Sequence, residues 1–273
     1  GDPRNQRWMS SAEVFGYDYR VFSSNGSINT TTEGVGIPGT GDPMANYPAG
    51  VFFGLPPAAK ARMMGRLEPV DLVFGHVLCE AEQPFRHVYF PLSGFVSLVA
   101  TVGVHPPLEM GLIGNEGMLG ASLILGIPIA PLRGVVQGPG TALRLSAADL
   151  RVELKASPSL VRTLQRYLYV LSAQLAQTAS CTRFHELEAR LARWLLMTHD
   201  RAHGDHFHLT HQFLANMLGV QRSAVTIAAG GLQERGIIHC TRGEIRILDR
   251  AGLEARACEC YAAVVRDYRQ IFA

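Results

Sequence analysis

Apolar side chains recur at intervals of three and four residues from residue 157 to residue 182, a spacing typical of one face of a helix. Ser157 can cap this helix, Pro158 suits its first turn, and no Gly or Pro interrupts the segment after that. Because the stripe is long and narrow, we predict a dimerisation helix over 157–182 whose stripe faces a second copy of the chain. A long helix packed on its own domain is the alternative. The predicted interface residues are Leu160, Leu164, Tyr167, Leu171, Leu175 and Thr178.

A second periodic segment, LANMLGVQRSAVTIAAGGLQERGII, begins at Leu214 and carries a glycine between two apolar runs. The first run is short and ends at Gly219, which suits the left-handed position that terminates a helix. The second run places Val225, Ala228 and Leu232 on one face. Two short helices joined by a tight glycine turn predict a helix-turn-helix, and a helical hairpin in an ordinary core is the alternative.

The flanking segments favour the helix-turn-helix. An amphipathic run, HELEARLARWLLMTHD, precedes it and predicts a third helix. The run IIHCTRGEIRILD follows it and predicts two short strands that turn at Arg242 and Gly243. We therefore predict a winged helix-turn-helix with a C-terminal helix over residues 183–273.

The first half of the chain has a different pattern of apolar and turn-forming residues. Short runs rich in Val, Leu and Phe, such as GFVSLVATV, alternate with Gly, Pro and Asn between residues 70 and 145, which predicts a β-sandwich or barrel. Residues 1–48 are rich in Gly, Ser, Thr, Asn and Pro and predict a flexible tail. The predicted fold class is α+β, with a β-barrel or jelly roll over residues 49–156, a long dimerisation helix and a C-terminal winged helix-turn-helix.

The composition narrows the class of protein. The 273 residues are 47% hydrophobic and 18% charged, and no apolar run reaches the roughly 20 residues that span a bilayer. Without a secretory signal pattern, we expect a cytoplasmic protein with no membrane partner. The net charge of +2 means that any DNA-binding surface must be basic locally. The five cysteines are odd in number and scattered, which is typical of a reducing compartment.

The order of these elements, and above all the stretch FLANMLGVQRSAVTIAAGGLQERGIIHCTRGEIRILD, resembles the Crp/Fnr family of bacterial transcription regulators. The stretches FPLSGFVSLV and GNEGMLG resemble the family's sensor barrel, which has a cyclic-nucleotide-binding-like fold. The resemblance covers about residues 50–260. It implies a homodimer that binds double-stranded DNA at a palindromic operator, with RNA polymerase as a further candidate partner. A ligand-binding module whose helix-turn-helix contacts other proteins is the alternative.

The resemblance also implies which side chains meet DNA, because the second helix of such a motif enters the major groove with its N-terminal residues. Arg222 is the strongest candidate, since its guanidinium can take both acceptors of a guanine or clamp a phosphate. Thr210 can cap the first helix and offer its hydroxyl or amide to a phosphate. The predicted DNA-binding residues are Gln221, Arg222, Ser223, Thr226, Thr210 and, at the turn of the wing, Arg242.

Relatives that bind cyclic AMP use a Gly-Glu pair for the ribose, an arginine and small residues for the phosphate, and Thr-Ser from the long helix for the base. Glu116 and Arg133 correspond to the first two elements and are the candidate effector-binding residues. Gly134 replaces the serine that assists the phosphate, and Leu175-Ala176 replaces Thr-Ser, so cyclic AMP is disfavoured. Another effector, no effector and a purely structural ion pair between Glu116 and Arg133 are the open alternatives.

We predict no metal and no other cofactor. No cysteine precedes Cys79, so the N-terminal cysteines that hold an iron–sulfur cluster in some relatives are missing, and Cys258-x-Cys260 is too sparse alone. The segment HDRAHGDHFHLTH could bind a transition metal with Asp200 and Asp205, but we favour a polar loop. The chain has no P-loop, Gly-x-Ser-x-Gly or His-Glu-x-x-His motif, which argues against an enzyme.

Overall fold

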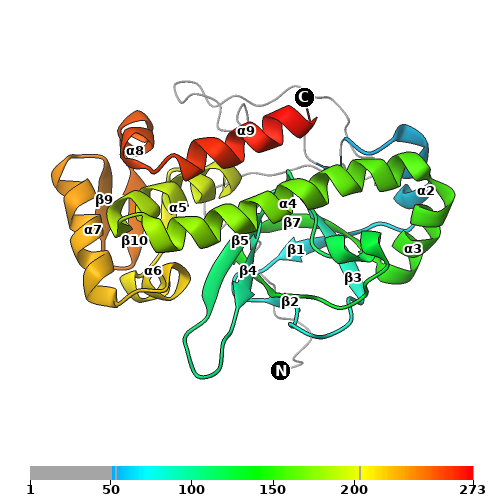
Figure 1. The fold of residues 1–273 in the computed structure, drawn as a ribbon, viewed down its shortest axis with the longest axis horizontal. Helices are drawn as coiled ribbons and strands as arrows, with labels where there is room; N and C mark the ends of the chain where they lie inside the picture. The colour runs from blue at the N-terminus through cyan, green and yellow to red at the C-terminus, as the bar shows by residue number, and fades with distance from the viewer. Residues whose placement is uncertain (1–50, 53, 203, 273) are drawn as a thin grey trace, which may run out of the picture. The chain divides into compact units, whose positions relative to one another are not determined.

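The computed structural model describes residues 51–52, 54–202 and 204–272. The predicted tail over residues 1–48 lies outside the described residues. Two β-sheets are followed by a long helix and then by a helical C-terminal part (Figure 1). None of the helices in the described part of the chain combines the length and hydropathy needed to cross a bilayer.

The N-terminal part contains two open antiparallel sheets, so the fold is jelly-roll-like and not a closed barrel. The first sheet has the order β1 (Glu68–Leu72), β7 (Gly140–Ser146) and β3 (His87–Pro91). The second has the order β2 (Val77–Cys79), β6 (Arg133–Gly138), β4 (Phe95–Ala100) and β5 (Leu108–Ile113). The connecting helices of this part are α2 (Pro57–Met64), η3 (Ala121–Leu125) and α3 (Ala147–Ala156).

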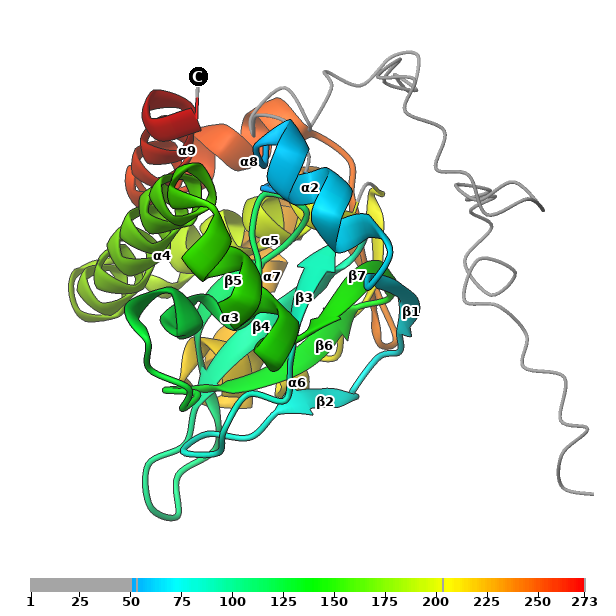
Figure 2. The ribbon, with the colours of Figure 1, turned by 90° about the vertical axis from the view of Figure 1, so that its right-hand side faces the viewer.

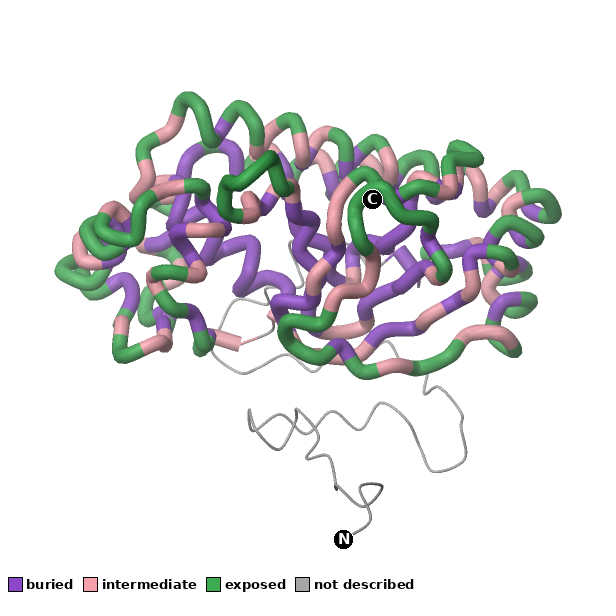
Figure 3. Tube along the Cα trace, turned by 90° about the horizontal axis from the view of Figure 1, so that it is seen from below, coloured by how far each residue is buried: buried purple, intermediate pink, exposed green. Residues whose placement is uncertain are grey.

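The long helix is α4 (Pro158–Phe184), which begins where the sequence predicted. Ser157 caps it by accepting a hydrogen bond from the backbone N–H of Leu160. Gln174 covers the exposed edge of β5, since its side chain bonds both the N–H (2.7 Å) and the carbonyl (3.2 Å) of Leu112. The alternation of buried and exposed positions along this helix is visible in Figure 3.

The apolar stripe of α4 faces the interior of its own protomer, which corrects the predicted dimer interface. Leu160, Leu164 and Tyr167 are fully buried and Leu171 is nearly so, because α4 packs on β5, η3 and α3. Leu175 and Thr178 are half-buried. The helix α9 (Cys260–Phe272) also runs alongside α4 (Figures 1 and 2). The spacing of this stripe fits either a dimer interface or packing within one protomer, and here its leucines belong to the core of the protomer.

The C-terminal part is the predicted winged helix-turn-helix. One of its strands, β8, is only three residues long and was not predicted; it pairs with β10 to complete a small sheet of order β8-β10-β9. The elements are α5 (Leu187–Ala202), β8 (His206–His208), α6 (His211–Leu218), α7 (Arg222–Glu234), β9 (Ile238–Thr241), β10 (Glu244–Ile247) and α8 (Arg250–Arg256).

One apolar core runs from the sheets into the helix-turn-helix. It includes Leu112 of β5, Tyr167 of α4, Leu191 of α5 and Leu214 of α6, all of them fully buried. The core therefore fixes α5 and α6 against the second sheet, and α7 lies on the far side of α5 and α6 from that sheet (Figure 1).

Candidate nucleic-acid interface

The helix α6 has a defined cap at each end. Thr210 caps α6 as predicted, with its hydroxyl oxygen accepting from the N–H of Phe213 at 3.1 Å. Gly219 ends α6 in the left-handed conformation (φ 66°, ψ 40°), as the sequence predicted. A Cβ at Gly219 would also come within 2.9 Å of Leu108 in β5. The left-handed backbone conformation therefore favours glycine here, and a side chain would also displace the terminal methyl group of Leu108.

The helix α7 has one buried and one outward face. Val225 and Leu232 point into the core, whereas Gln221, Arg222 and Ser223 are exposed. The first turn contains no acidic residue, and the side chain of the N-cap residue Gln221 makes no capping bond. The N-terminal backbone N–H groups and the partial positive charge of the helix are thus available to an anion such as a phosphate.

Thr226 is exposed but already engaged. Its hydroxyl donates to the carbonyl of Arg222 at 3.1 Å and lies 3.0 Å from Nδ1 of His211 in α6. Burial lowers the pKa of His211, and the positive charge of Arg222 lowers it further. Because its one proton is used within the helix, Thr226 is held in place and offers an external partner only its lone pairs.

Sequence reasoning missed Ile227, which is 77% exposed on the same outward face. It lies four residues after Ser223, opposite the buried Val225 and Leu232, so helical spacing alone could have identified it. An exposed aliphatic side chain on a helix that enters the major groove can contact the methyl group of thymine.

The wing presents Arg242 at its tip. Arg242 is exposed, and Gly243 adopts a left-handed conformation (φ 80°) that closes the tight turn between β9 and β10. The positive charge of Arg242 is therefore carried on a short, well-defined hairpin. Such a side chain can reach a phosphate next to a groove that α7 occupies.

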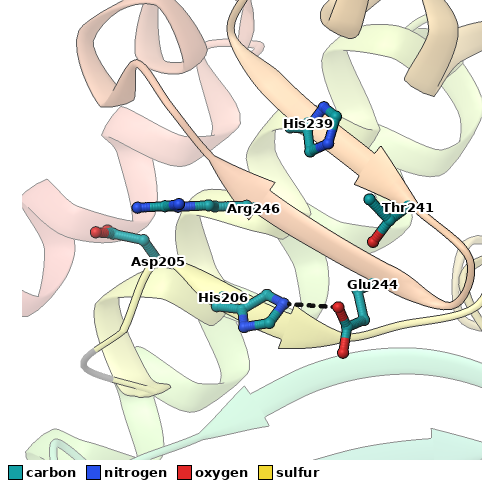
Figure 4. Close-up of a pocket in the computed structure, with 6 residues that line it drawn as sticks. All are labelled: Asp205, His206, His239, Thr241, Glu244 and Arg246. Atoms are coloured by element: carbon teal, nitrogen blue, oxygen red, sulfur yellow. Dashed lines mark hydrogen bonds and ion pairs between the residues drawn. The ribbon is translucent and has the colours of Figure 1, made fainter.

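An open polar pocket lies on the wing sheet (Figure 4). His206 and Glu244 face each other there at 3.1 Å, and acidic and basic groups are mixed, so the pocket does not select one sign of charge. The other residues that line it are Asp205, His239, Thr241 and Arg246.

The histidine-rich segment from His199 onward does not form a metal site in the part of the chain that the structure describes. His199 is buried and its Nε2 lies 2.7 Å from Asp205, which makes it part of the packing between α5 and the wing. His203 lies outside the described residues. The predicted polar loop is also wrong for much of the segment, because His199 and Asp200 are buried in α5 and residues 206–208 form β8.

The two candidate effector residues do not meet, so the alternative of a structural ion pair between them is wrong. Glu116 is buried and pairs with Arg201 of α5, at 2.8 Å to Nε and 2.6 Å to a terminal nitrogen. Arg133 is half-exposed and pairs with Glu80 at 3.1 Å. The carboxylate is thus neutralised by a helix from the other part of the chain, and the guanidinium lies at the surface.

The glycines that follow the two candidate effector residues pack closely against side chains. Tyr167 of α4 is fully buried, and a Cβ at Gly117 would lie 2.5 Å from its hydroxyl oxygen. Gly134 is packed in the same way, since a Cβ there would lie 3.0 Å from the sulfur of Cys79 and 3.1 Å from Leu119. The absence of a Cβ at these two glycines therefore allows close packing.

Residues 189–256 match the family model described as the Crp-like helix-turn-helix domain. The helix-turn-helix part of the chain is thus Crp-like. A CRP-like cAMP-activated global transcriptional regulator from Mycobacterium tuberculosis is 28% identical over 224 residues, which cover 77% of this chain and 96% of that protein. The fold is also similar to solved structures. A CRP/FNR family regulator from Thermus thermophilus matches with a TM-score of 0.58 and 23% identity over 70% of this chain and 98% of that one. FixK2 from Bradyrhizobium japonicum matches with a TM-score of 0.59 and 14% identity over the same shares.

A buried carboxyl joins the second sheet to the helix-turn-helix domain. Glu109 of β5 accepts a hydrogen bond from the indole N–H of Trp194 in α5 at 2.7 Å, and its other oxygen lies 2.6 Å from the hydroxyl of Ser97. Burial raises the pKa of Glu109 to about 7, although Ser97 and Trp194 act in the opposite direction.

A second polar cluster lies at the C-terminal end of α4. The fold brings together Cys181, His185, Cys258 and Cys260, so three of the five cysteines are not scattered in space. Sequence reasoning treated Cys258-x-Cys260 alone and missed Cys181 and His185. Their spacing of four residues on one helix face was the signal that could have added them.

Proposed function

We propose that this chain is a cytoplasmic, DNA-binding transcription regulator that acts as a homodimer on a palindromic operator. The observation that carries the proposal is the uncapped, acid-free N-terminal face of α7, which presents Gln221, Arg222 and Ser223 on a helix-turn-helix. In the proposed complex, Arg222 contacts a guanine or a phosphate and Ile227 contacts a thymine methyl group. Arg242 of the wing contacts the backbone.

Selection from a random pool of DNA duplexes tests this proposal. The full chain should enrich a palindrome whose half-sites are about one helical turn apart, because a twofold dimer presents two α7 helices at that spacing. Arg222→Ala should relax the selected sequence within each half-site. Arg266→Ala, which changes an exposed arginine on α9, is the matched control and should leave the sequence unchanged. A pool with no common sequence, together with salt-independent binding, would favour the protein-interaction scaffold instead.

The proposed dimer uses the outward face of α4, because the inward stripe is occupied. Tyr169 is 62% exposed, and Ala176 and Arg183 are exposed at intervals of seven residues along the same face. The small side chains between them allow two helices to approach closely. They are Ser172, Ala173, Ala179 and Ser180.

Ala176→Arg should give monomers in sedimentation without disturbing the protomer, since the Ala176 side chain is exposed in it. Ala262→Arg adds the same charge to an exposed position of α9 and should leave the dimer intact. A wild-type chain that sediments as a monomer at micromolar concentration, or an Ala176→Arg variant that remains a dimer, would contradict this assignment.

We also infer that the chain does not use cyclic AMP in the manner that the name of its Mycobacterium tuberculosis relative indicates for that protein. Glu116 is bound to Arg201 and Arg133 to Glu80, so a cyclic nucleotide would have to break both ion pairs. Calorimetric titration should detect no binding tighter than about millimolar. A micromolar dissociation constant that Arg133→Ala abolishes would contradict the inference.

RNA polymerase is the further partner that we propose for the DNA-bound dimer.

A further inference from the structure

The cluster at the end of α4 has the composition of a metal site. Four potential ligand atoms lie within 4.8 Å of one another, and they come from Cys181, His185, Cys258 and Cys260. The three cysteines are buried, whereas the side chain of His185 is 23% exposed. Three thiols and one imidazole are a common ligand set of structural zinc sites.

The separations fit a single tetrahedral ion. Zinc–sulfur bonds of about 2.3 Å and zinc–nitrogen bonds of about 2.0 Å place neighbouring ligand atoms roughly 3.5–3.8 Å apart. The sulfurs of Cys181 and Cys258 are 3.5 Å apart, and the sulfur of Cys260 is 3.3 Å from Nδ1 of His185. Small outward movements of these side chains would create the space for the ion.

Neighbouring groups orient the ligands as in known zinc sites. Nε2 of His185 lies 3.1 Å from the carboxylate of Glu259, which leaves Nδ1 directed at the sulfurs and available to a metal. The amide of Gln177 donates to the sulfur of Cys260 at 2.9 Å, a contact that favours the thiolate. Carboxylate–histidine–metal chains of this kind fix the ring orientation and the tautomer.

The local charge is complementary to such a site. Zinc with three thiolates and one neutral imidazole carries a net charge of −1. Arg190 and Arg193 of α5 are 9% and 6% exposed, and both interact electrostatically with Cys181. Buried arginines require a compensating negative charge, which the metal-bound thiolates would provide.

We propose that Cys181, His185, Cys258 and Cys260 bind one structural zinc ion. Binding converts the three thiols into thiolates and releases their protons, with no change of oxidation state. The ion joins the end of α4 to the segment between α8 and α9, and so holds α9 against α4 beside the two-residue link between α4 and α5. An iron–sulfur cluster, whose ligands bind two or more separate irons, and a Cys181–Cys258 disulfide are the competing chemistries.

Metal analysis of the untagged full chain, purified in the presence of a thiol reductant, tests the proposal. We expect about one zinc per chain. After chelation, titration with Co²⁺ should give thiolate-to-cobalt charge transfer in the near ultraviolet and the intense visible bands of tetrahedral cobalt. Chelation should also lower the midpoint of thermal unfolding, and added zinc should restore it.

Cys181→Ser and Cys258→Ser should each abolish the charge-transfer band or weaken it by at least a third, and Cys240→Ser is the matched control at a half-buried cysteine of β9. His185→Gln should keep the thiolate bands and weaken metal affinity, and it serves as the second variant if the cysteine variants fail to fold. Wild-type protein without a tetrahedral thiolate spectrum would overturn the proposal. So would a spectrum unchanged in both cysteine variants, an iron–sulfur absorption spectrum, or a Cys181–Cys258 disulfide in freshly alkylated protein.

Discussion

Replacing Glu109 with glutamine should remove the loss of folding stability that occurs when this buried carboxyl ionises at higher pH. Ser97 has one hydroxyl proton, yet its oxygen lies 2.6 Å from both Glu109 Oε2 and Gln137 Oε1. The contacts are all satisfied if Glu109 is protonated and donates to Ser97, which then donates to Gln137. This geometry agrees with the pKa of Glu109, which burial raises to about 7.

The size of this change in stability follows from the linkage between protonation and folding. The pKa of Glu109 rises from 4.5 to about 7 on folding, so the folded chain holds this proton more tightly than the unfolded chain. The free energy of unfolding therefore falls as pH rises between about 4.5 and 7, and the full loss is present above pH 7. At 1.36 kcal/mol per pKa unit, the loss amounts to about 3 kcal/mol. A glutamine stays neutral and can donate to Ser97 while accepting from Trp194.

Urea unfolding of the wild type and of Glu109→Gln at pH 5 and pH 8 measures this effect. The two proteins should have similar free energies of unfolding at pH 5, and the variant should be more stable at pH 8 by up to about 3 kcal/mol. Glu234→Gln, at an exposed position of α7, is the control and should show no such crossover. A Glu109→Gln variant that loses the same stability at both pH values would refute the reasoning, because Glu109 would then be ionised in the folded chain.

Two further substitutions test the packing that positions α7. Gly219→Ala should cost about 1–2 kcal/mol in urea unfolding, because alanine is strained in the left-handed conformation and meets Leu108. Gly230→Ala on the same helical hairpin has open space and should instead add about 0.5–1 kcal/mol; equal effects would contradict the role given to Gly219. Glu116→Gln should cost about 3 kcal/mol, because it breaks the buried ion pair between Glu116 and Arg201. Glu80→Gln at the exposed pair with Arg133 should cost less than about 1 kcal/mol, and a comparable loss would show that burial does not distinguish the two pairs.

The helix ends and the wing turn were predicted correctly, because each depends on a few neighbouring residues. Ser157 and Pro158 mark the start of α4, Gly219 marks the end of α6, and Gly243 marks the wing turn, as found. Capping and left-handed turns depend on a few neighbouring residues, so they can be recognised without knowing the rest of the fold.

Long-range pairings could not be predicted in this way. Glu116 meets Arg201 across 85 positions and Cys181 meets Cys258 across 77, and neither partner carries a sequence signal for the other. The stripe that includes Leu164 has the spacing of a helix–helix contact, but spacing does not reveal whether the partner is the same chain or a second one. Only the packing of α4 on the second sheet decides that.

The most direct test of the central claim is a salt titration of DNA binding by Arg222→Ala and Arg242→Ala. Anisotropy of the full chain is measured on the selected palindrome and on a scrambled duplex of the same composition. We predict that Arg222→Ala loses about 1–3 kcal/mol of discrimination between the two duplexes. Arg242→Ala should weaken binding to both and reduce the salt slope by about one unit, as for a phosphate contact. Equal loss on both duplexes for Arg222→Ala would make it a backbone contact, and no loss on either would contradict the placement of α7 in the major groove.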